Sequence, residues 1–371
     1  MKPLRLFVQV ALASIQASTL LASPTMIRIG YSDCAACHIS PQGAGMLTTY
    51  GKGIDEAQSL RAGEPRPIDT AAKRLIYDVR FIAASQLVDS LASGDSVSAS
   101  TFRLQLRSSV RVSEKNRMSY AAGLESPTLT SSAFGTSAAP KGVVSKALWE
   151  YRPKDGLEIA FGRDEMPSGI GLPDPQAFIR KGNDPGDTVY PTQVKMFWWN
   201  KHVQLTPYAF APGGDESPEV RQYGAGMLGG VDVWKQRAVL GVSARSSNAS
   251  TFTRRSAGAF ARLGFGRWGI LAEHDFTSRT ASDSTLTASQ YLAGHTQIFL
   301  AAKEWLVTSL AAEDLVVDGP RRSHTYRLTP GVQLRFSDNL TVIVNARDTF
   351  TGASAGRTRT FSVQVAVKTV E

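Results

Sequence analysis

The sequence predicts an all-β fold, a transmembrane antiparallel β-barrel of about 16 strands over residues 74–371, preceded by a small N-terminal segment. Three observations predict this fold. Apolar and polar side chains alternate with a period of two, short and long connections alternate along the chain, and many alternating segments run to ten residues or more. Strands of soluble sheets usually have five or six residues, whereas a strand that crosses a membrane at a tilt needs about ten.

The alternation is clear in residues 101–112, which read "TFRLQLRSSVRV". One face of this segment is apolar and carries Phe102, Leu104, Leu106, Val110 and Val112. The other face is polar and carries Arg103, Gln105, Arg107, Ser109 and Arg111. Residues 325–336 and 361–368 repeat the pattern, so we expect apolar faces to meet lipid and polar faces to line a lumen.

The connections delimit the strands. We expect strands at 75–88, 99–112, 117–126, 143–152, 156–163, 189–200, 203–211, 220–234, 236–247, 252–265, 267–278, 287–302, 305–317, 323–337, 339–350 and 358–370. Short turns such as "SEKN" alternate with longer loops such as "SPTLTSSAFGTSAAPK", which is typical of outer-membrane barrels. We expect the loop from Asp164 to Val189 either to lie outside the barrel or to fold inward as a constriction.

A soluble β-sandwich or β-helix is the alternative architecture, but it gives no reason for loops that alternate in length. Tryptophans near the strand ends fit the aromatic girdles of a membrane barrel, although they could also fill a core; they are Trp198, Trp199, Trp234, Trp268 and Trp305. The last residues, "VKTVE", depart from the aromatic residue on which bacterial barrels commonly finish.

The formal net charge is +9, yet Arg and Lys are spread along the chain, so we expect no nucleic-acid partner. The arginines on the polar strand faces predict a basic lumen that favours anions, or a haem with its propionates; plain solvation of these arginines is the alternative. No window of eighteen apolar residues occurs, which excludes a bundle of transmembrane helices.

Residues 1–23 read as a signal peptide. Lys2 and Arg5 precede an apolar stretch, and "LASPT" supplies small residues near its end. An N-terminal amphipathic helix is the alternative. Export, combined with the barrel, predicts a place in the bacterial outer membrane, with lipid around the barrel wall.

Both cysteines of the chain lie in "CAACH", residues 34–38, and C-x-x-C-H is the attachment signature of c-type haem. Cys34 and Cys37 would bind the two vinyl groups of one porphyrin, and the turn between them brings His38 beneath the ring as an axial iron ligand. We expect one covalent haem c in a segment at residues 24–60, which is too small to retain the cofactor otherwise. Residues 61–73, with two prolines in "RAGEPRPIDT", form a linker.

Other roles for the two cysteines are a thioredoxin-like redox pair, a zinc half-site or a disulfide. A redox pair favours a βαβ context and zinc requires further ligands, and the motif has neither around it. The second axial ligand stays open. Met46 is the candidate because it follows His38 among glycines, and its alternative role is a plain hydrophobic contact. Met26, Lys52, a barrel histidine or an open position are further options.

The residues Cys34, Cys37 and His38, in the setting "YSDCAACHISPQGAGMLTTYG", and the strands that follow them resemble the porin–cytochrome fusion proteins of iron-oxidising and other bacteria. In that family one N-terminal c-type haem segment precedes an outer-membrane barrel of about sixteen strands. The architectural resemblance covers the chain after residue 23, and the motif covers about twenty residues. The residues after the motif differ from the iron-oxidase branch.

The resemblance implies an outer-membrane electron-transfer protein that relays electrons between an extracellular redox partner and periplasmic carriers such as soluble cytochromes. An even number of strands leaves both ends of the barrel chain at the periplasmic end, so the haem segment that precedes the first strand is expected on the periplasmic side or in the lumen. The alternative is a transport porin with a structural or sensory haem. An enzyme with open haem iron would need a distal acid–base residue, and His38 is the only histidine in the segment, so we expect electron transfer rather than catalysis.

Overall fold

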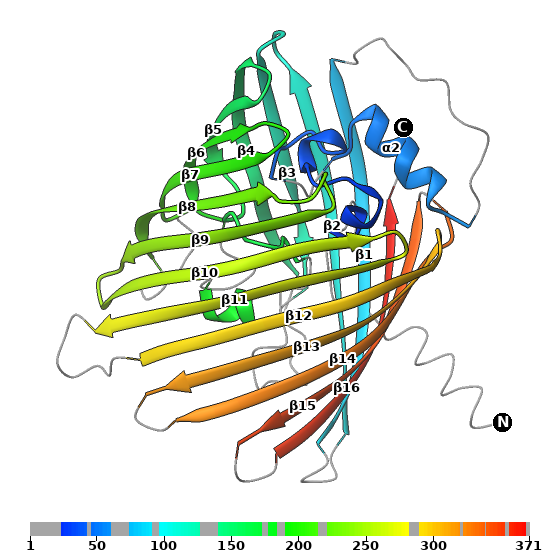
Figure 1. The fold of residues 1–371 in the computed structure, drawn as a ribbon, viewed down its shortest axis with the longest axis vertical. Helices are drawn as coiled ribbons and strands as arrows, with labels where there is room; N and C mark the ends of the chain where they lie inside the picture. The colour runs from blue at the N-terminus through cyan, green and yellow to red at the C-terminus, as the bar shows by residue number, and fades with distance from the viewer. Residues whose placement is uncertain are drawn as a thin grey trace.

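The computed structural model describes residues 24–42, 46–60, 74–90, 96–126, 140–172, 177–183, 190–213, 221–281, 289–319, 322–337, 339–352 and 356–368. In this part of the chain sixteen antiparallel strands form one closed barrel (Figure 1). The strands are β1 (Leu75–Ser90), β2 (Ser96–Arg111), β3 (Asn116–Glu125), β4 (Lys141–Lys154), β5 (Leu157–Arg163), β6 (Thr192–Trp199), β7 (Val203–Ala211), β8 (Tyr223–Asp232), β9 (Ala238–Asn248), β10 (Phe252–Phe265), β11 (Trp268–Ala281), β12 (Ser289–Lys303), β13 (Leu306–Asp318), β14 (Ser323–Arg335), β15 (Leu340–Thr351) and β16 (Gly356–Lys368). The fold class predicted from the sequence is confirmed.

Each strand pairs with its neighbours in sequence, and β16 closes the barrel against β1, from Arg80↔Lys368 to Ser90↔Thr358. The strand ends differ from the predicted ones by at most three residues. One end of the barrel, the short-turn end, has tight connections such as residues 155–156 and 266–267. The other, the long-loop end, includes the connection from β5 to β6.

The outer wall is apolar and the inner wall is polar. In β6, Val194, Met196 and Trp198 face outward and are exposed, whereas Lys195 and Phe197 between them face the lumen and are buried. This alternation recurs around the barrel, because successive side chains of a strand point to opposite faces. An apolar wall of this extent is suited to lipid rather than to water.

Aromatic side chains mark the outer wall near the short-turn end. Trp198, Trp234 and Trp268 are exposed there, and the rings of Trp234 and Phe265 lie 5.7 Å apart. These three tryptophans are placed as a membrane girdle requires. Trp199 differs, because its side chain lies on the lumen side.

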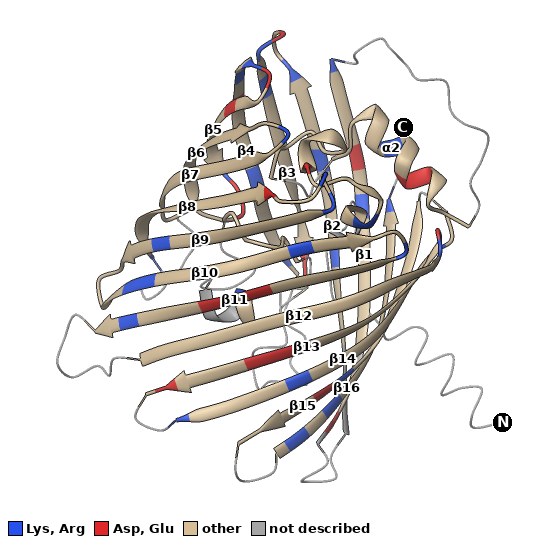
Figure 2. Ribbon diagram, viewed as in Figure 1, with Lys and Arg blue, Asp and Glu red and all other residues tan. Residues whose placement is uncertain are grey.

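The lumen carries charges of both signs, so part of its arginine charge is neutralised by carboxylates. Arg107 donates two hydrogen bonds to Asp78, at 2.6 and 2.5 Å, and Arg103 contacts Glu125 at 2.6 Å. Figure 2 shows acidic and basic positions interspersed along the strands. A buried guanidinium is costly unless a carboxylate compensates it, and here neighbouring strands supply the carboxylates.

The N-terminal segment lies inside the short-turn end of the barrel (dark blue in Figure 1). It consists of η1 (Pro24–Ile29), η2 (Cys34–Ala36) and α2 (Thr49–Ala57). The N–H of Leu60 donates to the carbonyl of Arg335 at 2.7 Å. A Cβ on Gly264 of β10 would lie 2.2 Å from the carbonyl oxygen of Ile27, so this glycine lets η1 approach the wall. The sequence predicted this segment either on the periplasmic side or in the lumen, and in the structure it lies in the lumen.

The connection from β5 to β6 also folds inward, and we call its described residues, 164–172 and 177–183, the constriction loop. It contains α3 (Phe178–Asn183). The N–H groups of Gly169 and Ile170 donate to the carboxylate of Glu273 at 3.1 and 2.8 Å. A luminal apolar cluster that includes Ile27, Ile170 and Phe260 joins this loop and η1 to the wall.

Neither α2 nor α3 was predicted from the sequence. Gly51 and Gly53 within α2 made that segment read as a loop, but Thr48 caps the helix by accepting a hydrogen bond from Gly51 N at 3.0 Å. No helix in the described ranges is long and apolar enough to cross a membrane. The predicted signal peptide 1–23 and linker 61–73 lie outside the described residues.

Candidate functional site

The CAACH residues form a tight helical turn. Asp33 starts it, because its carboxylate accepts a hydrogen bond from Ala35 N at 2.9 Å. The N–H groups of Cys37 and His38 donate to the carbonyl of Cys34 at 3.2 and 2.9 Å. Cys34, Cys37 and His38 line the same cavity, and both cysteines are free thiols. The structure therefore brings together the three residues that the sequence selected.

The turn rests on the N-terminus of α2. Thr48 donates from its N–H and its hydroxyl to the carbonyl of Cys37, at 2.9 and 3.2 Å. A Cβ added to Gly51 would lie 2.1 Å from that same carbonyl oxygen. Only glycine at position 51 allows the helix to sit this close to the motif.

Replacing Gly51 by alanine is expected to push α2 away from Cys37 and to destabilise the N-terminal segment by about 1–3 kcal/mol, as overpacking does. Gly53→Ala is the matched control, because a Cβ there meets nothing within 4 Å in the same helix. That change should stabilise the helix by about 0.5–1 kcal/mol. Limited proteolysis of the folded barrel measures both. Equal cleavage rates in the two variants would contradict the close seating of α2.

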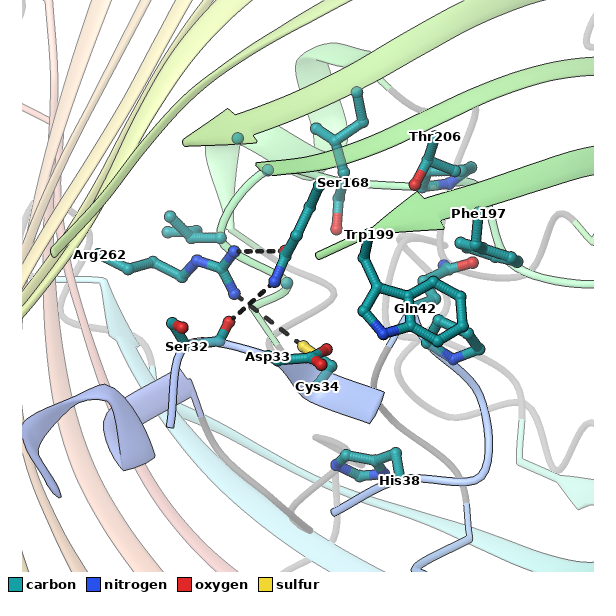
Figure 3. A pocket seen from close by; sticks show the side chains of 18 of the residues that line it. Ser32, Asp33, Cys34, His38, Gln42, Ser168, Phe197, Trp199, Thr206 and Arg262 are labelled. Carbon is teal, nitrogen blue, oxygen red and sulfur yellow. Dashed lines mark hydrogen bonds between the residues drawn. The ribbon is translucent and has the colours of Figure 1, made fainter. Parts of the chain in front are cut away.

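The cavity beside the motif has an empty volume of about 1090 Å³ and lies between the N-terminal segment, the constriction loop and the wall (Figure 3). Its wall residues come from β6, β7, β8 and β10, and they include Phe197, Trp199, Gln204, Leu228, Phe260 and Arg262. Ligand pockets are mostly apolar with a few polar groups, and the lining of this cavity matches that description.

Burial dominates the electrostatics of the motif. His38 and Cys37 are 2% and 6% exposed. Burial raises the pKa of the Cys37 thiol, and the charges of Cys34, Asp33 and Asp55 add to the effect. The raised pKa keeps the Cys37 thiol protonated at neutral pH.

A tyrosine pair separates the cavity from solvent at the short-turn end. Tyr31 lines the cavity, and its hydroxyl is hydrogen-bonded to that of Tyr50, which is exposed. This hydrogen bond, followed by burial, raises the pKa of Tyr31 to about 12. At the short-turn end of the barrel, Tyr31 and Tyr50 thus lie between the cavity and the solvent.

Met46 does not share the cavity of His38. His38 pairs with Leu47 in an isolated antiparallel bridge, and the N–H of Ile39 donates to the carbonyl of Met46 at 3.0 Å. Since neighbours in an extended segment alternate in direction, His38 and Met46 point to opposite faces. Met46 is buried and lines a second luminal cavity of about 750 Å³, together with Arg80.

Arg262 of β10 is a cation in the wall of the first cavity. It is 8% exposed, and its Nη1 lies 4.0 Å from the Sγ of Cys34. Its Nη2 donates to Oε1 of Gln204 at 3.4 Å, and Gln204 in turn donates to the carbonyl of Ser32 at 3.2 Å (Figure 3). The Nε of Arg262 is buried and makes no hydrogen bond within the described residues.

These residues fit a covalent haem. Two free thiols and an imidazole on one turn are the donor set that c-type attachment uses. The cavity they line is large and largely apolar, and the orphaned Nε of Arg262 suits a ligand with acidic groups. In the described ranges no cluster of three or more His, Cys, Asp and Glu side chains could hold a metal ion, so no zinc ligand set forms around the motif there.

Sequence reasoning missed the wall of this site. Trp199 read as part of an aromatic girdle and Arg262 as one of many arginines on polar strand faces. Gln204 gave no signal. Once Trp198 and Leu263 are known to face outward, alternation turns Trp199 and Arg262 toward the lumen, and Gln204 follows because it pairs with Trp199. Alternation does not say which strands lie opposite residue 34.

No protein-family model and no curated protein matches this sequence. Solved structures match the fold. An anion-selective porin from Comamonas acidovorans is 10% identical with a TM-score of 0.61, over 80% of this chain and 99% of that one. OprB of Pseudomonas putida in its high-pH structure is 10% identical with a TM-score of 0.61, over 80% of this chain and 94% of that one. A loop-deletion mutant of OmpT from Vibrio cholerae is 9% identical with a TM-score of 0.59, over 80% of this chain and 100% of that one. At these identities the likeness shows the porin-like barrel fold alone.

Proposed function

We propose that this chain is a bacterial outer-membrane electron-transfer protein that carries one covalent haem c inside a porin-like barrel. Cys34 and Cys37 would attach the haem, and His38 would ligate its iron. One observation carries the proposal: the three residues of the attachment motif line one large cavity within a closed barrel whose outer wall is apolar. A redox group in that position lies within the thickness of an insulating bilayer.

Bound there, haem supplies one-electron chemistry at a potential set by its surroundings. The chain does the rest. The two thiols fix the position, and the apolar side chains of Phe197 and Trp199 limit the access of water. Because the N-terminal segment precedes the first strand, the short-turn end faces the periplasm. A soluble periplasmic cytochrome would approach the cavity there, beside Tyr31 and Tyr50.

The contents of the lumen favour electron transfer over solute passage. Both the N-terminal segment and the constriction loop occupy it, and a shared apolar cluster joins them to the wall. Electrons tunnel through such packed protein, whereas solutes need a continuous water-filled path.

An anion-transporting porin with a structural or sensory haem is the second candidate. The luminal arginines Arg245 and Arg279 favour it, because neither has a carboxylate within 4.0 Å in the described ranges, and Arg279 instead covers the ring of Phe252 at 3.9 Å. The fold likeness to an anion-selective porin supports the same candidate.

Full-length protein in sealed proteoliposomes tests the proposal. A reductant that does not cross lipid is added outside, and a soluble cytochrome c is trapped inside. We expect a haem-stained band for the chain in the outer-membrane fraction, rapid reduction of the trapped cytochrome and low ion conductance. Slow reduction with large, anion-selective conductance would favour the second candidate. A chain that is present in that fraction without covalent haem would overturn both.

A further inference from the structure

The cation in the haem cavity has no counter-ion in the part of the chain that the structure describes. No carboxylate lies within 4.0 Å of the Arg262 guanidinium there, and its buried Nε makes no hydrogen bond. The contrast with Arg107 is direct, because that buried luminal arginine is held by both oxygens of Asp78. Arg262 therefore lacks the contacting carboxylate that Arg107 has.

The neighbours that Arg262 does have compensate it poorly. Burying an unpaired ion is costly. The ring of Phe260, 5.7 Å away, offers only a weak cation–π contact, and the amide oxygen of Gln204 at 3.4 Å is a neutral acceptor at long range. Asp33 and Glu273 are near enough for their carboxylates to interact with the charge of Arg262, but in the described residues neither has an oxygen within 4.0 Å of the guanidinium, so neither forms a contact ion pair with it.

The space in front of Arg262 has the character of a site for a flat, mostly apolar ligand. Phe260 lies on its own strand, and Phe197 and Trp199 line the same cavity from β6. Gln204, held by the carbonyl of Ser32, keeps the guanidinium oriented toward the cavity rather than toward the wall. One cation among aromatic walls selects a ligand that is apolar over most of its surface and acidic at an edge.

We propose that Arg262 is a positioning residue that binds a carboxylate of the porphyrin in this cavity, so that the site selects a porphyrin with acidic side chains over a neutral one. The inference rests on the proposed haem site and adds the group that recognises the acidic edge of the macrocycle. Its test needs neither iron nor thioether bonds.

The full-length chain, produced without haem attachment and folded in detergent, is titrated with protoporphyrin IX and with its dimethyl ester. Quenching of tryptophan fluorescence reports binding, since Trp199 lines the cavity. We expect the diacid to bind about tenfold or more tightly than the diester, as a charge-assisted pair with a buried guanidinium implies. Arg262→Gln should abolish this preference, and Arg262→Lys should retain part of it.

Arg279→Gln is the matched control. It removes the same charge from the luminal face of β11, eight residues beyond Leu271, the pairing partner of Arg262, and thus roughly 26 Å away at 3.3 Å per residue. It should keep the full preference. Heat-dependent mobility in gels verifies that each variant has folded.

Equal binding of the two porphyrins to the wild-type chain would overturn the inference, and so would a preference that survives in Arg262→Gln. The outcome is separable from that of the proposed function. Covalent haem in the outer membrane together with equal binding removes only the role of Arg262. A diacid preference without covalent haem in the membrane supports the role of Arg262 and removes the proposed function.

Discussion

Replacing both Cys34 and Cys37 by alanine is expected to remove haem from the chain and to lower electron transfer across proteoliposomes to the rate of empty vesicles. In the proposed function the two thiols are the covalent attachment points of the haem, and a segment of this size has too small a core to hold the cofactor alone. The barrel should assemble normally, because in the described part of the chain the only strand residue within hydrogen-bond range of these thiols is Arg262, whose Nη1 lies 4.0 Å from the Sγ of Cys34.

A haem-stained gel of the outer-membrane fraction, visible absorption and the proteoliposome assay measure the loss. Heat-dependent gel mobility verifies that the barrel has formed. Stained haem that persists in the double variant would contradict attachment at these positions. Reduction at the wild-type rate without haem would contradict the electron-transfer proposal itself.

Met46→Leu is the matched control for this experiment. It alters another buried sulfur-containing side chain of the same segment, one that lines the second cavity and points away from His38. We expect full haem content and an unchanged absorption spectrum. A shift of the spectrum in this variant would identify Met46 as the second axial ligand and would show that the segment rearranges when haem binds.

The barrel was predictable because its determinants are local. A strand with lipid on one side and a polar lumen on the other must alternate, and in β2 Leu104 and Leu106 are exposed while Arg107, next to Leu106, is 4% exposed. Turn residues then delimit each strand without reference to any other part of the chain. The motif at Cys34, Cys37 and His38 was equally readable, because its three residues are adjacent in sequence.

The wall of the cavity was not predictable, because it depends on contacts between residues far apart in sequence. Gln204 reaches the carbonyl of Ser32, and Arg262 reaches Cys34, only after sixteen strands close and the N-terminal segment enters the lumen. The same limit applies to charge. Arg107 and Asp78 lie on different strands, so the sequence shows two isolated charges where the structure has an ion pair.

The fate of Met46 illustrates a third limit. The spacing of Met46 from His38 along the chain is consistent with Met46 as a second ligand of the same haem iron. The hydrogen bond from Ile39 to Met46 instead forms a bridge in which direction alternates residue by residue, and this separates the two side chains. A shift of one residue in the register of this bridge would turn Met46 toward the face of His38. Neither composition nor spacing in the sequence determines that register.

The second large effect is expected at Lys195, which is fully buried and ties three parts of the lumen together. Its Nζ donates to Gln42 of the N-terminal segment at 2.7 Å and to Asp164 and the carbonyl of Glu165 in the constriction loop, both at 2.8 Å. Lys146 of β4 lies 3.2 Å from the same Asp164. One side chain of β6 therefore holds the N-terminal segment and the constriction loop to the wall.

Lys195→Met is expected to loosen both segments and to raise the ion conductance of single channels in planar bilayers. Removing one partner of a buried ion pair costs about 3–5 kcal/mol, because the carboxylate that remains is buried with less compensation. Proteolysis of the N-terminal segment should accelerate in parallel. The double variant Lys195→Met/Asp164→Leu removes both charges and should recover part of the loss.

Acid should open the same contact in the wild-type chain. Burial alone raises the pKa of Asp164, but the ammonium groups of Lys146 and Lys195 outweigh it and hold that pKa below the ordinary aspartate value of about 3.9. A carboxylate with a lowered folded-state pKa stabilises above its unfolded pKa, and this stability is lost as the pH falls through the folded value. Conductance should therefore rise only below about pH 4, and in Lys195→Met the rise should begin at higher pH.

Lys201→Met is the matched control, because Lys201 is an exposed lysine in the turn that follows β6. Surface substitutions of this kind change stability by less than about 0.5 kcal/mol, so its conductance and its pH profile should equal those of the wild type. A Lys195→Met channel that also equals the wild type in both measurements would mean that the N-terminal segment and the constriction loop are held by the apolar cluster around Ile27 and Ile170 rather than by this buried network.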